Sequence, residues 1–152
     1  LPGAGAAGGM AGGFAAFLGG GIHSGIETIL DIGRYDHLLE NSDLLLTGEG
    51  CLDGQSFSGK ALGVLFRRAS RSGVPVIALA GAVSGPARRR TGPGVAAFSI
   101  VPGPLPAALA MAQAGSLLAD AATEALKAVL LGRRLTRPAA HRRSRKRKNA
   151  LA

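Results

Sequence analysis

The chain has 152 residues, of which 47% are hydrophobic, and its 18 Lys and Arg outnumber its 9 Asp and Glu to give a formal charge of +9. The hydrophobic content excludes wholesale disorder, and the length is that of one ordinary domain. The 24 glycines recur without a three-residue period, which excludes a collagen-like chain.

The excess positive charge is confined to the C-terminal end. Nine of the 18 Lys and Arg lie between Arg133 and Lys148 with no acid among them, whereas residues 1–132 carry equal numbers of both signs. We therefore predict a charge-neutral folded domain over residues 1–132 and a basic, disordered tail over residues 133–152. Because the tail has no aromatic residue for stacking on bases, we expect nucleic acid to bind only non-specifically, through this tail.

Cysteine content and hydropathy bear on location. Cys51 is the single cysteine, so we expect neither an intrachain disulfide nor a cysteine-based zinc site, which favours a cytoplasmic protein. No segment reaches the ~18 consecutive apolar residues of a membrane-spanning helix, and no signal peptide opens the chain. We expect no membrane partner.

Helical patterns dominate the first forty residues. The large apolar residues of the Gly-rich first block share one helix face: Met10, Phe14, Phe17 and Leu18. Ser24 and Glu27 have the spacing of a capping box, which predicts a helix from Gly25 to about Gly33. A further short helix is predicted over residues 35–41.

The pattern then changes to one of strands separated by connections. Short apolar runs predict buried strands at residues 43–47, 74–80 and 95–101. Helices are predicted over residues 60–71 and 104–131, whereas residues 84–94, rich in Gly, Pro and Arg, are poorly suited to a helix. This order predicts an α/β fold, a Rossmann-like (flavodoxin-like) parallel sheet with flanking helices and right-handed crossovers.

A polar loop, residues 48–59, follows the first predicted strand. Ligands of open α/β sheets bind at the carboxyl ends of strands, where this loop lies. It collects several kinds of functional group between glycines, with a lysine after it: Glu49, Asp53, Gln55, Ser56, Ser58 and Lys60. Two carboxylates can hold Mg²⁺ or act as a base, and a lysine at a helix start can meet a phosphate. The alternative is an ordinary polar loop with Lys60 in solvent.

Two glycine motifs match nucleotide-binding patterns in part. Gly3, Gly5 and Gly8 have the G-x-G-x-x-G spacing, but only Leu1-Pro2 precede them where a dinucleotide fingerprint needs a strand. Tight helix packing, or a phosphate-facing loop of another kind, is the better interpretation. The segment 54–60 resembles a P-loop, but alanine follows its lysine where the Mg²⁺-binding hydroxyl belongs.

Four segments resemble the bacterial glycerate kinase family, of the glycerate 2-kinase type. In family order they are LPGAGAAGGM at 1–10, DLLLTGEG with LDGQS and GK within 43–60, GVPVIALAG at 73–81 and FSIVPGP at 98–104. The resemblance covers roughly residues 1–130. It implies that the chain corresponds to the C-terminal part of a two-domain kinase and belongs to its Rossmann-like lobe.

The resemblance also implies ATP-dependent phosphorylation of glycerate to phosphoglycerate with Mg²⁺, an activity that we expect to be incomplete in this chain. Glu49 and Asp53 are assigned to Mg²⁺ or the glycerate hydroxyl, and Lys60 to a phosphate or the substrate carboxylate. Substrate and phosphate contacts are expected from Gly5, Gly8, Gly9, Gly48, Gln55 and Ser56. Two alternatives stay open: an inactive fragment, and a module that binds polyanions through the basic tail.

Overall fold

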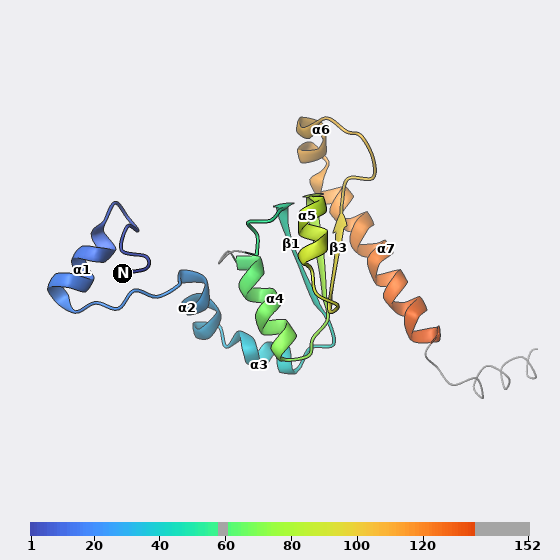
Figure 1. Cartoon of the computed structure of the whole chain (residues 1–152). Helices are drawn as coiled ribbons and strands as arrows, with labels where there is room; N and C mark the ends of the chain where they lie inside the picture. Colours follow the sequence, from blue (N-terminus) through green and yellow to red (C-terminus); the bar gives the residue numbers. More distant parts are fainter. Residues whose placement is uncertain (58–60, 136–152) are drawn as a thin grey trace, which may run out of the picture.

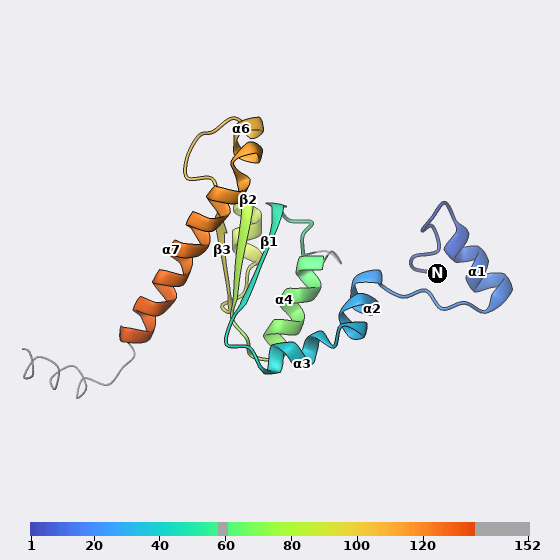
Figure 2. The same ribbon diagram turned by 180° about the vertical axis from the view of Figure 1, so that it is seen from behind.

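The computed structural model describes residues 1–57 and 61–135. Within them, three parallel strands form one sheet in the order β1-β2-β3: β1 (Leu45–Leu52), β2 (Val76–Val83) and β3 (Val95–Ser99). Helices flank this sheet on both sides, as Figures 1 and 2 show from opposite directions. The predicted α/β fold with a parallel sheet is confirmed.

Both crossovers between strands lie on one face of the sheet. Helix α4 (Ala61–Arg71) connects β1 to β2, and α5 (Gly85–Arg90) connects β2 to β3. The inner face of α4 buries Leu62, Phe66 and Ala69 against the central strand β2, in one hydrophobic core that also includes Ala87 of α5. Because β2 is covered on both faces, its first five residues are all buried, as the continuous apolar pattern predicts.

The opposite face is covered by the C-terminal helices. Ala125 of α7 (Ala114–Leu135) packs with Ile77 and Leu79 in a second, smaller core. The prediction of one helix over residues 104–131 was wrong, because Gln113 leaves the helical conformation and separates α7 from α6 (Ala107–Ala112). Helix α7 also continues to Leu135, so Arg133 and Arg134 lie in a helix and not in the predicted tail. The rest of that tail lies outside the described residues.

Three helices precede the sheet, at the predicted places: α1 (Met10–Leu18), α2 (Gly25–Ile32) and α3 (Tyr35–Glu40). Helices α2 and α3 contact α4. Helix α1 has no buried residue and lies away from the sheet, at the end of a connection that leads to α2 (Figures 1 and 2). The N-terminal glycine block is therefore separate from the strand ends.

Near the sheet, the structure differs from the prediction chiefly at the end of β1 and in one helix that was not predicted, while the bounds of β2 and β3 shift by up to three residues. Strand β1 pairs with β2 as far as Leu52, so the polar loop begins at Asp53 and not at residue 48. The segment judged unsuitable for a helix contains α5. Its N-cap is Ser84, whose Oγ accepts from Ala87 N–H at 3.2 Å, and a proline in the first turn lacks only an N–H that has no partner there.

The predicted capping box is also wrong. Ser24 does precede the first residue of α2, but its side chain makes no capping hydrogen bond. The Glu27 carboxylate binds Arg67 and Arg68 of α4 instead of the start of its own helix. In the described part of the chain, no helix combines the length and apolar character needed to cross a membrane.

Candidate functional site

The segments that follow the three strands meet at one edge of the sheet, because parallel strands end on the same side. β1 leads into the loop 53–57, which we call the Asp53 loop. Next to it, Ser84 N–H donates to the Leu52 carbonyl at 3.0 Å, which joins the ends of β1 and β2. In open α/β sheets this edge is where ligands bind.

Glu49, Asp53 and Ser56 form a connected group, the Ser56 cluster. Ser56 is 1% exposed, and its Oγ donates a short hydrogen bond to the Glu49 carboxylate. The same Oγ accepts from the Asp53 N–H at 3.1 Å and lies 3.4 Å from Asp53 Oδ1. One buried hydroxyl therefore links a strand carboxylate, to which it donates its proton, to a loop residue, whose N–H it accepts, and the Asp53 carboxylate lies beside it.

The Asp53 side chain shapes the turn that follows it. Its Oδ1 accepts from the N–H of Gln55 at 2.8 Å and from the N–H of Ser56 at 3.1 Å. This arrangement is an Asx turn, in which a short carboxylate replaces a backbone acceptor. The turn fixes the Asp53 carboxylate relative to the end of β1.

The second half of the Asp53 loop is packed between two helices. The Phe57 ring lies 5.7 Å from the Phe66 ring of α4, centroid to centroid. The Arg90 guanidinium of α5 lies 5.3 Å from the Phe57 ring centroid, and Arg90 Nη1 donates to the Gly54 carbonyl at 3.0 Å. Sequence reasoning noted Arg90 only as one of three consecutive arginines and did not predict its contact with the loop. Nothing in the local pattern shows this contact, because it joins residues 36 apart in the chain.

A groove of about 1360 Å³ lies on the other face of the sheet, between β1 and the helices α6 and α7. Its lining is mostly apolar and includes Leu46, which is 45% exposed. Glu49 is the one ionisable residue in the described lining, and Ser99 supplies a hydroxyl. Glu49 therefore belongs both to the Ser56 cluster and to the border of the groove.

The other predicted residues of this region have different surroundings. Gly48 lies in β1, where an added Cβ would run into the carbonyl oxygen of Leu79, so the sheet itself requires a glycine there. Gln55 is exposed in the Asp53 loop. Ser58 and Lys60 lie outside the described residues, so the predicted role of Lys60 stays a prediction.

The structure does not bring Gly5, Gly8 and Gly9 to the Asp53 loop, because they precede α1, away from the sheet (Figure 1). Gly8 and Gly9 have left-handed backbone conformations, with φ of 66° and 94°. The N–H of Gly9 donates to the carbonyls of Gly5 at 3.3 Å and Ala6 at 3.2 Å. These glycines shape the turn into α1, and their predicted phosphate contact stays a prediction.

The Ser56 cluster fits a magnesium ion only in part. In residues 1–57 and 61–135, no group of three His, Cys, Asp or Glu side chains could form a complete metal site. Mg²⁺ in nucleotide-dependent enzymes needs less, since one or two carboxylates, water and substrate phosphates complete its six ligands. Glu49 and Asp53, held at one hydroxyl, match that smaller donor set.

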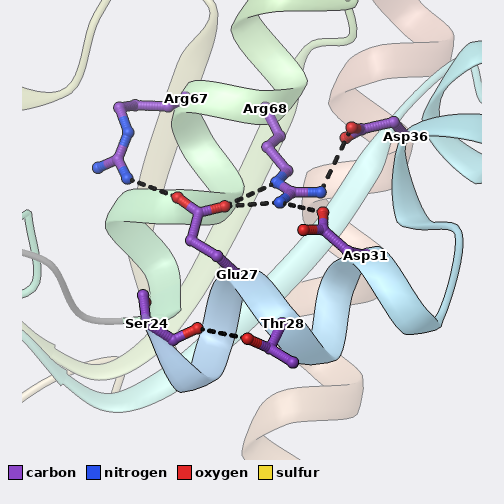
Figure 3. Close-up of polar contacts among 7 residues, drawn as sticks. All are labelled: Ser24, Glu27, Thr28, Asp31, Asp36, Arg67 and Arg68. Carbon is purple, nitrogen blue, oxygen red and sulfur yellow. Dashed lines mark hydrogen bonds and ion pairs between the residues drawn. The ribbon is translucent and has the colours of Figure 1, made fainter. Parts of the chain in front are cut away.

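A second charged cluster holds helices together on the far side of α4 (Figure 3). Arg68, with a side chain only 10% exposed, pairs with Glu27 and Asp31 of α2, both at 2.6 Å, and with Asp36 of α3 at 3.3 Å. The hydrogen bonds from Arg68 hold the pKa of Glu27 below its ordinary value, and those from Glu27 and Asp31 raise the pKa of Arg68. This cluster ties α2 and α3 to α4.

The fold and the acidic loop together define an open-sheet α/β protein with a candidate ligand site at the carboxyl end of β1. Comparison with known proteins identifies its family. Residues 1–130 match the model of the glycerate kinase family, and the chain belongs to that family. The resemblance seen in the sequence is confirmed.

Individual relatives agree. The chain is 40% identical over 123 residues to a glycerate kinase of Halalkalibacterium halodurans. The aligned segment covers 80% of this chain and 32% of that protein. It is 39% identical over 84 residues to the glycerate 2-kinase of Escherichia coli K12, and here the aligned segment covers 55% of this chain and 22% of that protein.

A crystal structure from Salmonella typhimurium LT2, provisionally assigned as glycerate kinase 2, superposes with a TM-score of 0.65 at 31% identity. The match covers 88% of this chain and 34% of that one. The chain therefore spans about a third or less of the length of these relatives.

Proposed function

We propose that this chain supplies part of the active site of a glycerate kinase, which transfers a phosphoryl group from ATP to a hydroxyl of glycerate and yields phosphoglycerate and ADP. The observation that carries the proposal is the Ser56 cluster, two carboxylates held at one buried hydroxyl beside the carboxyl end of β1. Family membership supports the choice of glycerate as substrate.

Each site residue has a role in this proposal. Phosphoryl transfer depends mostly on positioning and on electrostatic stabilisation of spreading negative charge. Asp53 orients the glycerate hydroxyl and accepts its proton, and Glu49 together with Asp53 would hold the metal ion. Ser56 keeps the two carboxylates in place through its Oγ. Lys60 is assigned to a phosphate or to the substrate carboxylate.

Mg²⁺, when bound with ATP, would neutralise charge on the transferring phosphate. In the proposal it is held by Glu49 and Asp53. The glycines at positions 5, 8 and 9 would contact phosphate only if the substrates bridge the distance between α1 and the sheet.

Because the chain spans only about a third of the length of its relatives, the experiment tests it within a longer glycerate kinase. We would replace the matched segment of the H. halodurans glycerate kinase with residues 1–130 of this chain and measure ADP release with ATP, Mg²⁺ and D-glycerate. The chain alone is measured in parallel. Glycerate-dependent ADP release by the chimera supports the proposal, and an inactive chimera that is folded contradicts it.

Two further expectations accompany this proposal. A cytoplasmic location stays a prediction from the single cysteine. Polyanion binding through residues 133–152 also stays a prediction, since all but the first three of those residues lie outside the described part. It is tested by the salt dependence of binding to DNA before and after residues 136–152 are removed.

A further inference from the structure

Helix α5 reaches the Asp53 loop through one side chain. The Arg90 guanidinium donates to the Gly54 carbonyl at 3.0 Å and lies 5.3 Å from the centroid of the Phe57 ring. Gly54 and Phe57 are at opposite ends of the part of the loop that follows Asp53. Arg90 therefore contacts the loop at Gly54, within the Asx turn that Asp53 closes, and at Phe57, directly after that turn.

The Phe57 ring is held from two directions. It packs against Phe66 of α4 on one side and faces the guanidinium of Arg90 on another. A cation above an aromatic face is attracted by the electrons of the ring, and a planar guanidinium can do this while it donates a hydrogen bond. Arg90 thus connects the loop after β1 to the helix after β2.

The neighbouring arginines do not share this arrangement. Arg88 Nη1 reaches the Ala97 carbonyl at 3.5 Å, on β3 and away from the loop. The Arg89 side chain is exposed and makes no hydrogen bond or ion pair with the described residues. Helix position therefore separates Arg90 from two residues of the same type.

We propose that Arg90 is a positioning residue, which holds the Asp53 loop and, through its Asx turn, sets the place of the Asp53 carboxylate beside Glu49. The positioning is a property of the folded chain, and its catalytic consequence rests on the proposed function. Arg90 itself touches no reacting atom. Its hydrogen bond and its ring contact restrict the loop, so its loss increases the fraction of time that the turn is open.

Hydrogen exchange tests the positioning without substrate. The amides of Gln55 and Ser56, which bind Asp53 Oδ1, report on the turn. Removing one hydrogen bond and one exposed cation–π contact with Arg90→Ala should raise their exchange rates about tenfold. Arg90→Lys, which keeps the charge but not the planar fork, should give an intermediate rate. Arg89→Ala is the matched control and should leave both rates unchanged.

If Arg90 only stabilised the fold, Arg90→Ala would raise the exchange rates of core amides in β2 and lower the melting temperature, together with the change in the loop. We expect the β2 exchange rates and the melting temperature of Arg90→Ala to equal those of Arg89→Ala. Loop rates equal to those of the wild type, or a uniform rise over the whole chain, would overturn the proposal.

The catalytic consequence is measured in the chimera. Arg90→Ala should lower kcat about tenfold with a smaller change in KM for ATP, and Arg90→Lys should restore part of it. An unchanged kcat with a change only in KM for ATP overturns positioning of Asp53, whereas loss of loop protection in a chimera without any turnover contradicts only the proposed function.

Discussion

Ser56 is the residue on which the candidate site depends most. Its Oγ is bonded to the Glu49 carboxylate, seven residues away, and to the N–H of Asp53. From the sequence, Glu49, Asp53 and Ser56 could be grouped only as polar residues of one loop. Their connection could not be predicted, because the extension of β1 to Leu52 turns Glu49 from a loop residue into a strand residue.

Ser56→Ala should reduce the free energy of unfolding by about 1–3 kcal/mol, because it leaves a part-buried carboxylate and the Asp53 N–H without their partner. Urea unfolding measures the change. Ser70→Ala, at an exposed position of α4, is the control and should be near neutral. A loss no larger than that of Ser70→Ala would contradict a structural role for the hydroxyl.

Gly48 was assigned to substrate binding from its place in the sequence, whereas the structure shows a packing constraint. An added methyl group would meet the Leu79 carbonyl oxygen on the paired strand. Gly48→Ala should therefore destabilise the chain by about 1–3 kcal/mol. Gly50→Ala, in the same strand with no atom within 4 Å of its Cβ position, should cost much less. Equal unfolding midpoints for the two variants would contradict this account.

Among the elements, the strands and most helices could be predicted because their signals are local. Apolar runs marked β2 and β3, and the period of Leu62, Phe66 and Ala69 marked the inner face of α4. Helix α5 was missed because Gly85 and Pro86 suggest a break, although Ser84 before them is an N-cap residue. The division between α6 and α7 had no signal in an Ala- and Leu-rich segment.

Glu27 illustrates a contact that only the tertiary structure reveals. Its local pattern predicts a capping box, but the carboxylate binds arginines 40 and 41 residues away. The helix was predicted correctly and its stabilising interaction was not. Local spacing indicates where a helix starts, whereas the partner of a charged side chain depends on which helix packs beside it.

The Arg68 cluster gives α2 a pH dependence. Hydrogen bonds from Arg68 lower the pKa of Glu27 from its ordinary value of 4.5. A lowered pKa means that the stabilisation is present above pH 4.5 and is lost as the pH falls through the pKa of the folded state. Amide exchange of α2, followed from about pH 6 to about pH 3 after correction for intrinsic rates, should show a loss of protection.

Glu27→Gln should weaken this pH dependence, because residue 27 can no longer titrate. Glu124→Gln, which removes an exposed carboxylate from an ion pair within α7, is the control and should leave α2 as in the wild type. The same acid-induced loss of protection in Glu27→Gln as in the wild type would contradict an origin in Glu27.

At the scale of the whole molecule, two features fit a chain that aligns with only about a third of the Salmonella structure. Both are surfaces that are poorly covered within the described residues. The groove beside β1 leaves Leu46 about half exposed, and α1 has no buried residue. The chain covers 34% of the Salmonella structure. Parallel sheets are ordinarily covered on both faces, so the groove face of β1 is less complete than the face under α4.

The net charge of +9 contributes little to this account. It arises from residues 133–152, whereas the family match covers residues 1–130, whose formal charges balance. The candidate chemistry lies in that neutral region, at Glu49 and Asp53. The composition alone would have directed attention to nucleic acid and away from the strand ends.

The central claim is that the Asp53 carboxylate at the end of β1 takes part in phosphorylating glycerate. The most direct measurement is glycerate-dependent ADP release by the chimera carrying Asp53→Asn, beside a chimera carrying Asp43→Asn, shortly before the start of the same strand. We predict a fall in kcat of at least about a hundredfold for Asp53→Asn and a near-normal rate for Asp43→Asn. Equal rates for the two folded variants would contradict the claim.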